Sequence, residues 1–193
     1  MRKKSHIALA VGLVHGLDLK TRMRHKLSFY IGSLWPDITP SFFTRRHCID
    51  ETFELTGNYM TKFLDRYNAK RDLTVGSSFR LGIIMHYIAD YFTYPHNTHF
   101  PGTLAEHCSY EEVLKKDMYT FIGKVLRDEQ VQEQLPVYAD VEHVLSHILS
   151  VHDHYMTLPG STEHDCIYSY RTCAVVLASL LLMAENTEIA IAA

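Results

Sequence analysis

The chain has 193 residues, with 19 Lys and Arg against 22 Asp and Glu, which gives a formal charge of −3 at pH 7. A chain of this length buries about 70% of the surface that it exposes when unfolded, so it needs no disulfide or structural metal to hold a core. Charged residues at 21%, with nine Gly and six Pro, exclude a disordered, collagen-like or low-complexity chain. The near-neutral balance excludes a global basic field of the kind that attracts nucleic acid or anionic membranes. Histidine is unusually frequent, with 13 residues, and neutral imidazole is the commonest metal ligand of proteins.

Apolar residues recur with a helical rather than an alternating period through most of the chain. In chain order, helices are predicted over 6–17, 22–33, 50–68, 75–94, 104–127, 138–156 and 163–188. Ser5, Thr74 and Asp140 are expected N-caps, and Thr103 with Glu106 has the form of a capping box. Since no repeat, linker or composition break divides the chain, we expect one all-α domain over residues 1–193.

Two apolar runs bear on the location of the protein. The first, 7–14, follows three basic residues and imitates a secretory signal, but it stops at His15 and no convincing cleavage site follows Gly16. The second, 174–184, has 11 residues, short of the ~20 that span a bilayer. The four Cys form no CxxC pair and are expected to be free thiols. We therefore expect a soluble, cytoplasmic protein with no transmembrane segment, and secretion is the alternative.

Two pairs of histidine and carboxylate stand close together in the sequence. His86 and Asp90 are four residues apart in the strongest helical stretch, so both side chains lie on one face and can converge on one cation. His107 and Glu111 repeat this spacing, and His96 lies between the pairs in an irregular, proline-containing segment. A single pair of this kind arises often by chance as a solvated pair. Two pairs that bracket His96 within 26 residues indicate a metal site.

Three upstream residues extend the pattern: His6 in the first helix, Asp37 in an irregular Trp-Pro-Asp segment, and His47. In this order the residues resemble the bacterial zinc-dependent phospholipase C family and the related fungal single-strand-specific nucleases. The shared pattern is an N-terminal His, a Pro-Asp loop, a lone His, HxxxD, a His six residues later, and HxxxE or HxxxD. The resemblance runs from Met1 to about Glu112.

The resemblance implies a multi-helix bundle with a metal cleft that holds two to three Zn²⁺ ions and hydrolyses phosphate esters. It implies that one ion is held by Asp37, His47, His86 and Asp90, and a second by His96, His107 and Glu111. Asp90 would bridge the first ion to a third, which would be bound by His6 and the amino group of the chain. This chain begins with Met1, whereas the mature family members begin with a tryptophan that signal cleavage exposes.

The expected chemistry follows from the ligand types. Zinc accepts imidazole and carboxylate ligands, and sites with open positions keep a water. Two ions that share Asp90 are expected to lower the pKa of a water from about 15.7 towards ~7 and to neutralise the phosphoryl oxygens. Asp37, as the catalytic residue, is expected to orient this water or accept its proton. Because the histidine ligands must be neutral, activity is expected to fall below about pH 6.

The substrate is expected to be a phosphate ester, with phospholipid as one candidate. A single-strand nuclease would need aromatic stacking platforms and a basic groove, and no stable nucleic-acid partner is expected. An HD-type nucleotide phosphohydrolase would use an adjacent His-Asp pair, either His152-Asp153 or His164-Asp165. A non-catalytic zinc-binding domain is the remaining alternative. The sequence provides no prediction of the oligomeric state.

Four basic residues near the predicted ligands could attract a phosphate: Lys3, Lys4, Arg45 and Arg46. Solvated surface charge is their simpler interpretation.

Overall fold

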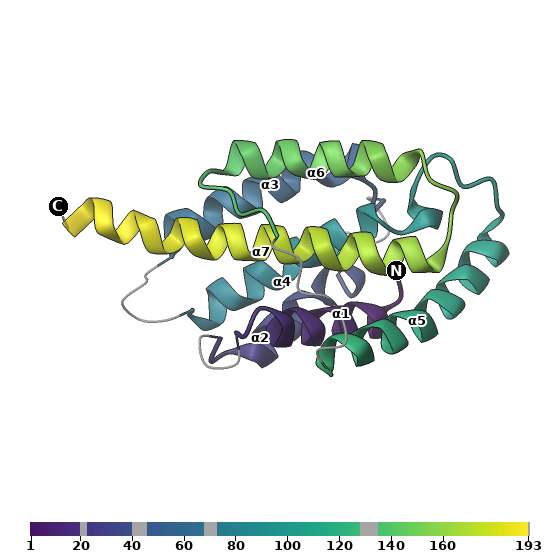
Figure 1. Cartoon of the computed structure of the whole chain (residues 1–193), viewed down its shortest axis with the longest axis horizontal. Helices are drawn as coiled ribbons and strands as arrows, with labels where there is room; N and C mark the ends of the chain where they lie inside the picture. The colour runs from purple at the N-terminus through teal and green to yellow at the C-terminus, as the bar shows by residue number, and fades with distance from the viewer. Residues whose placement is uncertain (20–22, 40–45, 68–72, 128–134, 193) are drawn as a thin grey trace.

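The structure is a computed structural model that describes residues 1–19, 23–39, 46–67, 73–127 and 135–192. This part of the chain forms seven α-helices and two short 3-10 helices, with no strand (Figure 1). The α-helices are α1 (Lys3–Gly16), α2 (Lys26–Gly32), α3 (Ile49–Arg66), α4 (Val75–Tyr91), α5 (Leu104–Leu126), α6 (Val141–Met156) and α7 (Thr162–Ala192). The 3-10 helices are η1 (Trp35–Asp37) and η4 (Tyr94–His96). The predicted all-α class is confirmed.

Each predicted helix has a counterpart, and the differences lie at the ends. Thr74 and Asp140 cap α4 and α6 through their side chains, and Thr103 with Glu106 forms both halves of a capping box on α5. The prediction that Ser5 is an N-cap is wrong, because α1 begins at Lys3 and Ser5 is a buried residue of its first turn. The second helix is shorter than predicted, and residues 20–22 lie outside the described part of the chain.

α4 is the central helix of the bundle. It packs against α2, α3 and α7, and all of its residues from Leu81 to Tyr91 are buried. A helix that is buried on every side belongs to the core rather than to an amphipathic surface. Its two polar residues near the C-terminal end, His86 and Asp90, are both 0% exposed. Buried polar groups of this kind need polar partners, and these come from other elements.

Two glycines allow α2 and α4 to approach closely. A Cβ at Gly82 would overlap the carbonyl oxygen of Phe29 in α2, and a Cβ at Gly32 would overlap the carbonyl oxygen of Phe79 in α4. The two backbones therefore touch where any other residue would hold them apart. This contact places the end of α2, and Ser33 after it, beside His86.

α7 runs along the bundle (Figure 1) and covers part of α4, α5 and α6. By length and composition, its stretch Thr162–Glu185 could cross a bilayer. Most of this stretch is buried inside the protein, and the core helix of a soluble protein has the same properties. The helix contains the apolar run 174–184 and corresponds to the helix predicted over 163–188. The absence of a transmembrane segment and the cytoplasmic location stay predictions.

Candidate metal centre

The structure brings the predicted ligand residues together in two groups. Asp37, His47, His86 and Asp90 each offer a ligand atom, and within this group the atoms lie within 4.8 Å of one another. The second group, defined in the same way, is His96, His107 and Glu111. These groups match the division into first and second sites that the resemblance implied.

The first group comes from three separate parts of the chain. η1 provides Asp37, the segment before α3 provides His47, and one face of α4 provides His86 and Asp90. Asp90 Oδ2 lies 3.2 Å from His47 Nδ1 and 3.3 Å from His86 Nε2, and these two nitrogens are 3.0 Å apart. Asp37 Oδ1 lies 3.6 Å from His47 Nδ1 and 3.7 Å from His86 Nε2. Two ring nitrogens and two carboxylate oxygens therefore face one point, as the ligands of a cation do.

Backbone carbonyls orient two of these imidazoles. His86 Nδ1 donates to the carbonyl oxygen of Ser33 at 2.9 Å, and His96 Nδ1 donates to that of His47 at 3.2 Å. A carbonyl oxygen only accepts, so in the neutral rings the proton is on Nδ1 and the lone pair is on Nε2. Such partners are typical of metal-binding histidines. The Ser33 carbonyl could not be predicted as a partner from the sequence, because a backbone acceptor has no residue type of its own.

The second group lies nearer the surface. The capping box starts α5 so that His107 and Glu111 share one face, and η4 places His96 opposite them. His96 Nε2 and His107 Nε2 each lie 3.2 Å from Glu111 Oε1. The side chain of His107 is 26% exposed, against 0% for His86, so the second group is the more open of the two.

The amino group of Met1 lies between the two groups. It is 2.8 Å from Asp90 Oδ1, 2.9 Å from Glu111 Oε1 and 2.9 Å from His96 Nε2. His6 Nε2 lies 3.3 Å from the same oxygen of Asp90, and it is buried without a hydrogen bond. These contacts bring Met1, His6 and Asp90 together, which is the arrangement that the resemblance implied for a third ion.

The ionisation of Asp90 and His6 is suited to metal binding, whereas Asp90 and Asp37 outweigh burial and raise the pKa of His86, so that its ring must lose a proton before it binds metal. Burial opposes charge on the Asp90 carboxyl, but the Met1 amino group and the neighbouring histidines outweigh it and hold its pKa well below the usual value. Burial lowers the pKa of His6 to about 4, so this imidazole stays neutral. Burial also opposes the charge on the Met1 amine, yet Asp90 and Glu111 raise its pKa to about 10. Ionised carboxylates and neutral imidazoles are the ligand forms, whereas the amine must lose a proton before it can bind metal.

The donor set fits zinc. Imidazole nitrogens and carboxylate oxygens are its usual ligands, and the unpaired, buried Nε2 of His6 is an electron-pair donor that a metal would satisfy. The model of the zinc-dependent phospholipase C family matches residues 5–159. The chain belongs to this family. No curated protein and no solved structure matches the chain.

The family match extends beyond Glu112, where the resemblance was expected to end. The matched residues therefore include the whole of α6.

The two adjacent His-Asp pairs considered for an HD-type hydrolase lie outside both ligand groups. His152 Nε2 donates to Asn97 Oδ1 at 2.9 Å, and Asp153 is exposed. Asp165 is buried and accepts hydrogen bonds from Tyr155 and other donors. Among the described residues, neither pair belongs to a set of converging ligand atoms.

Proposed function

We propose that the protein is a zinc-dependent hydrolase of phosphate esters, a phosphodiesterase of the phospholipase C type. One observation supports this most directly: both ligand groups border the same cleft. A cavity of about 830 Å³ is lined by Asp37 and His47 of the first group and by all three residues of the second. A closed structural zinc site would bury its ligands away from such a space.

Two or three zinc ions fit the donors present. The first would be held by Asp37, His47, His86 and Asp90, and the second by His96, His107 and Glu111. A third would take His6, Asp90 and the amine of Met1. Bound zinc supplies an acidified water at neutral pH and compensates the negative charge of the phosphoryl group.

Asp37 is the proposed catalytic residue. Its side chain is 8% exposed and lines the cleft, and its Oδ1 faces the two imidazoles of the first group. This orientation leaves Oδ2 as the oxygen that accepts a proton from the attacking water or orients it. No nucleophilic side chain is required, because positioning and charge stabilisation supply most of the catalysis in phosphoryl transfer.

The test is the substitution Asp90→Asn, with Asp65→Asn as the matched control on an exposed part of α3. We expect Asp90→Asn to lose at least one zinc ion and about 100-fold or more in hydrolysis of bis(p-nitrophenyl) phosphate, because a neutral amide cannot bridge two cations. The measurements are zinc content by mass spectrometry and the initial rate. Asp65→Asn should keep both.

Three results would contradict the proposal. Full activity in Asp90→Asn, or activity that resists a chelator, would exclude this mechanism. Tightly bound zinc without turnover of phosphodiester, phospholipid or nucleic-acid substrates would favour the non-catalytic zinc-binding domain. Loss of activity on substitution of Asp153 or Asp165, with Asp90 unimportant, would favour the HD-type phosphohydrolase.

A further inference from the structure

The cleft over the ligand groups gathers positive charge, although the formal charge of the whole chain is −3. Of its fifteen lining residues, five are basic: Arg2, Lys3, Lys4, Arg46 and Lys115. The two lining carboxylates, Asp37 and Glu111, both belong to the ligand groups. No other acidic residue among the described lining residues neutralises the basic ones.

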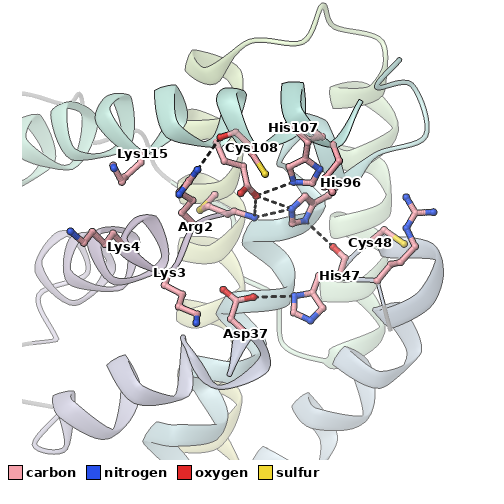
Figure 2. A pocket seen from close by; sticks show the side chains of 15 residues that line it. Arg2, Lys3, Lys4, Asp37, His47, Cys48, His96, His107, Cys108 and Lys115 are labelled. Atoms are coloured by element: carbon pink, nitrogen blue, oxygen red, sulfur yellow. Dashed lines mark hydrogen bonds and ion pairs between the residues drawn. The ribbon is translucent and has the colours of Figure 1, made fainter. Parts of the chain in front are cut away.

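The basic residues flank the ligands on two sides. Figure 2 shows Arg2, Lys3, Lys4 and Lys115 on the side of α1 and α5, with His47 on the other side. Arg46 directly precedes His47 and also lines the cleft. A substrate whose phosphate lies over the ligand atoms would therefore have cations at both of its ends.

Two of the five basic side chains form ion pairs with another described residue, and three do not. Arg2 and Lys115 both form ion pairs with Glu112. Lys3, Lys4 and Arg46 are exposed, and their side chains form no ion pair with another described residue. Arg45, the other basic residue noted in the sequence, lies outside the described residues.

The start of α1 is an unfavourable place for two lysines. The first turn of α1 carries no acidic residue, and the N-cap position has no side-chain hydrogen bond. Since the N-terminal end of a helix carries partial positive charge, cations there are disfavoured and anions are favoured. Lys3 and Lys4 thus reinforce a positive potential over the cleft instead of compensating it.

The other described lining residues contribute histidine, cysteine, methionine, proline and leucine side chains. None of the fifteen described lining residues is Phe, Tyr or Trp. Stacking of single-stranded bases uses aromatic side chains, and so does recognition of a quaternary ammonium such as choline. Leu104, which is 78% exposed at the cleft, offers an apolar contact instead.

We propose that the cleft selects phospholipids whose head group carries a negative charge in addition to the scissile phosphodiester, with Lys3, Lys4 and Arg46 facing that charge. This inference rests on the proposed function. In the reaction, the bond between phosphorus and the glycerol oxygen breaks. Water supplies the hydroxyl group to phosphorus and a proton to diacylglycerol, and the phosphorylated head group is released.

Short-chain lipids below their critical micelle concentration test this selectivity without a membrane surface. Dioctanoyl phosphatidylinositol 4-phosphate, the same lipid without the 4-phosphate, and dioctanoyl phosphatidylcholine are compared by kcat/KM. We expect the phosphorylated lipid to exceed phosphatidylinositol by about tenfold, the size of two modest charge contacts. Phosphatidylcholine should be the poorest substrate. The preference should shrink with added salt, because the cations are exposed.

The double variant Lys3→Gln, Arg46→Gln should reduce the ratio of the two inositol lipids about tenfold. The control is the double variant Lys62→Gln, Lys124→Gln, which removes two positive charges from exposed positions on α3 and α5 outside the cleft. It should keep the wild-type ratio of kcat/KM for the two inositol lipids. An equal ratio in the two double variants would overturn the inference.

The remaining outcomes separate the inference from the function on which it rests. Hydrolysis of bis(p-nitrophenyl) phosphate without a preference for the phosphorylated lipid overturns the inference alone. A single-stranded oligonucleotide cleaved faster than every lipid overturns it in favour of a nuclease. No hydrolysis of any of these compounds by the zinc-loaded protein overturns both.

Discussion

Asp90 is the residue on which the ligand groups converge. Its Oδ2 faces the imidazoles of His47 and His86, and its Oδ1 faces the Met1 amine and His6. An unpaired carboxylate that is 0% exposed would cost several kcal/mol, so these positive or polar partners are necessary for folding as well as for metal binding. A single residue of α4 thereby contacts polar groups that lie up to 89 positions away in the sequence.

The position of the Met1 amino group predicts that zinc binding depends on a free N-terminus. A protein that begins at Met1 should bind more zinc than the same chain preceded by a short Gly-Ser extension, because an amide nitrogen is not a metal ligand of comparable strength. Zinc per chain, measured by mass spectrometry after dialysis, should fall by about one ion in the extended protein. The same extension at the C-terminus is the control. Equal zinc content in all three proteins would remove Met1 from the ligand set.

A second prediction concerns the buried carboxyl group of Asp165. Burial raises its pKa to about 6, against the opposing effect of Tyr155, Tyr94 and Tyr110, which donate hydrogen bonds to it. Because the folded-state pKa is above the unfolded value of 3.8, the stability from this group is complete below pH 3.8 and is lost as the pH rises through about 6. The free energy of unfolding of the wild type relative to Asp165→Asn should therefore fall between pH 4 and pH 7, by up to about 3 kcal/mol.

Urea denaturation at each pH gives the two free energies, and their difference cancels the titration of groups that both proteins share. An NMR titration of the Asp165 carboxyl carbon checks the pKa directly. A free-energy difference independent of pH would contradict the assignment.

Contacts between pairs of helices set the geometry of the site. The close approach of α2 to α4 brings the Ser33 carbonyl within 2.9 Å of His86 Nδ1. The packing of α1 on α5 brings the Met1 amine within 2.9 Å of Glu111, and Arg2 in the same region donates to the carbonyl oxygen of Cys108 at 3.1 Å. Each helix fixes the spacing of its own ligands, while the distances between ligands from different helices depend on interhelical packing.

The contact between α2 and α4 yields a prediction for Gly82→Ala. The added methyl group would overlap the carbonyl oxygen of Phe29, so α2 must move away and the bond from His86 to Ser33 must weaken. We expect a loss of about 1–3 kcal/mol in stability and about tenfold or more in affinity for the first zinc. Chemical denaturation and zinc competition titrations measure the two effects.

Gly76→Ala is the matched control on the same helix. A Cβ at Gly76 meets no atom within 4 Å, and alanine favours a helix by about 1 kcal/mol over glycine, so this variant should be as stable as the wild type or more so. Equal behaviour of the two variants would show that the close approach has no role in the site.

In the folded protein, three carboxylates, five imidazoles and one amine lie close together between α1, α4 and α5. Most of these groups are buried, so the loss of their hydration opposes folding, and bound cations would compensate for it. The protein is therefore expected to be markedly more stable with zinc than without it.

Removal of zinc tests this expectation. At a free zinc concentration of about 1,000 times Kd, one site adds about 4 kcal/mol, which is about 10 °C in Tm for a chain of this size. Differential scanning calorimetry of the chelated and the zinc-loaded protein measures the shift. Asp90→Asn should show a smaller shift, and an equal Tm with and without zinc would contradict the assignment of the buried ligands.

The sequence by itself determined the helical class, most caps and the order of the ligand residues. These properties depend on local periodicity: His86 with Asp90, and His107 with Glu111, share a helix face whatever the rest of the chain does. Only the tertiary structure decided that His47 meets Asp90, that the Ser33 carbonyl orients His86, and that the basic residues gather at one cleft. Contacts between distant segments depend on the distance between packed helices, and the spacing of residues within one helix does not specify that distance.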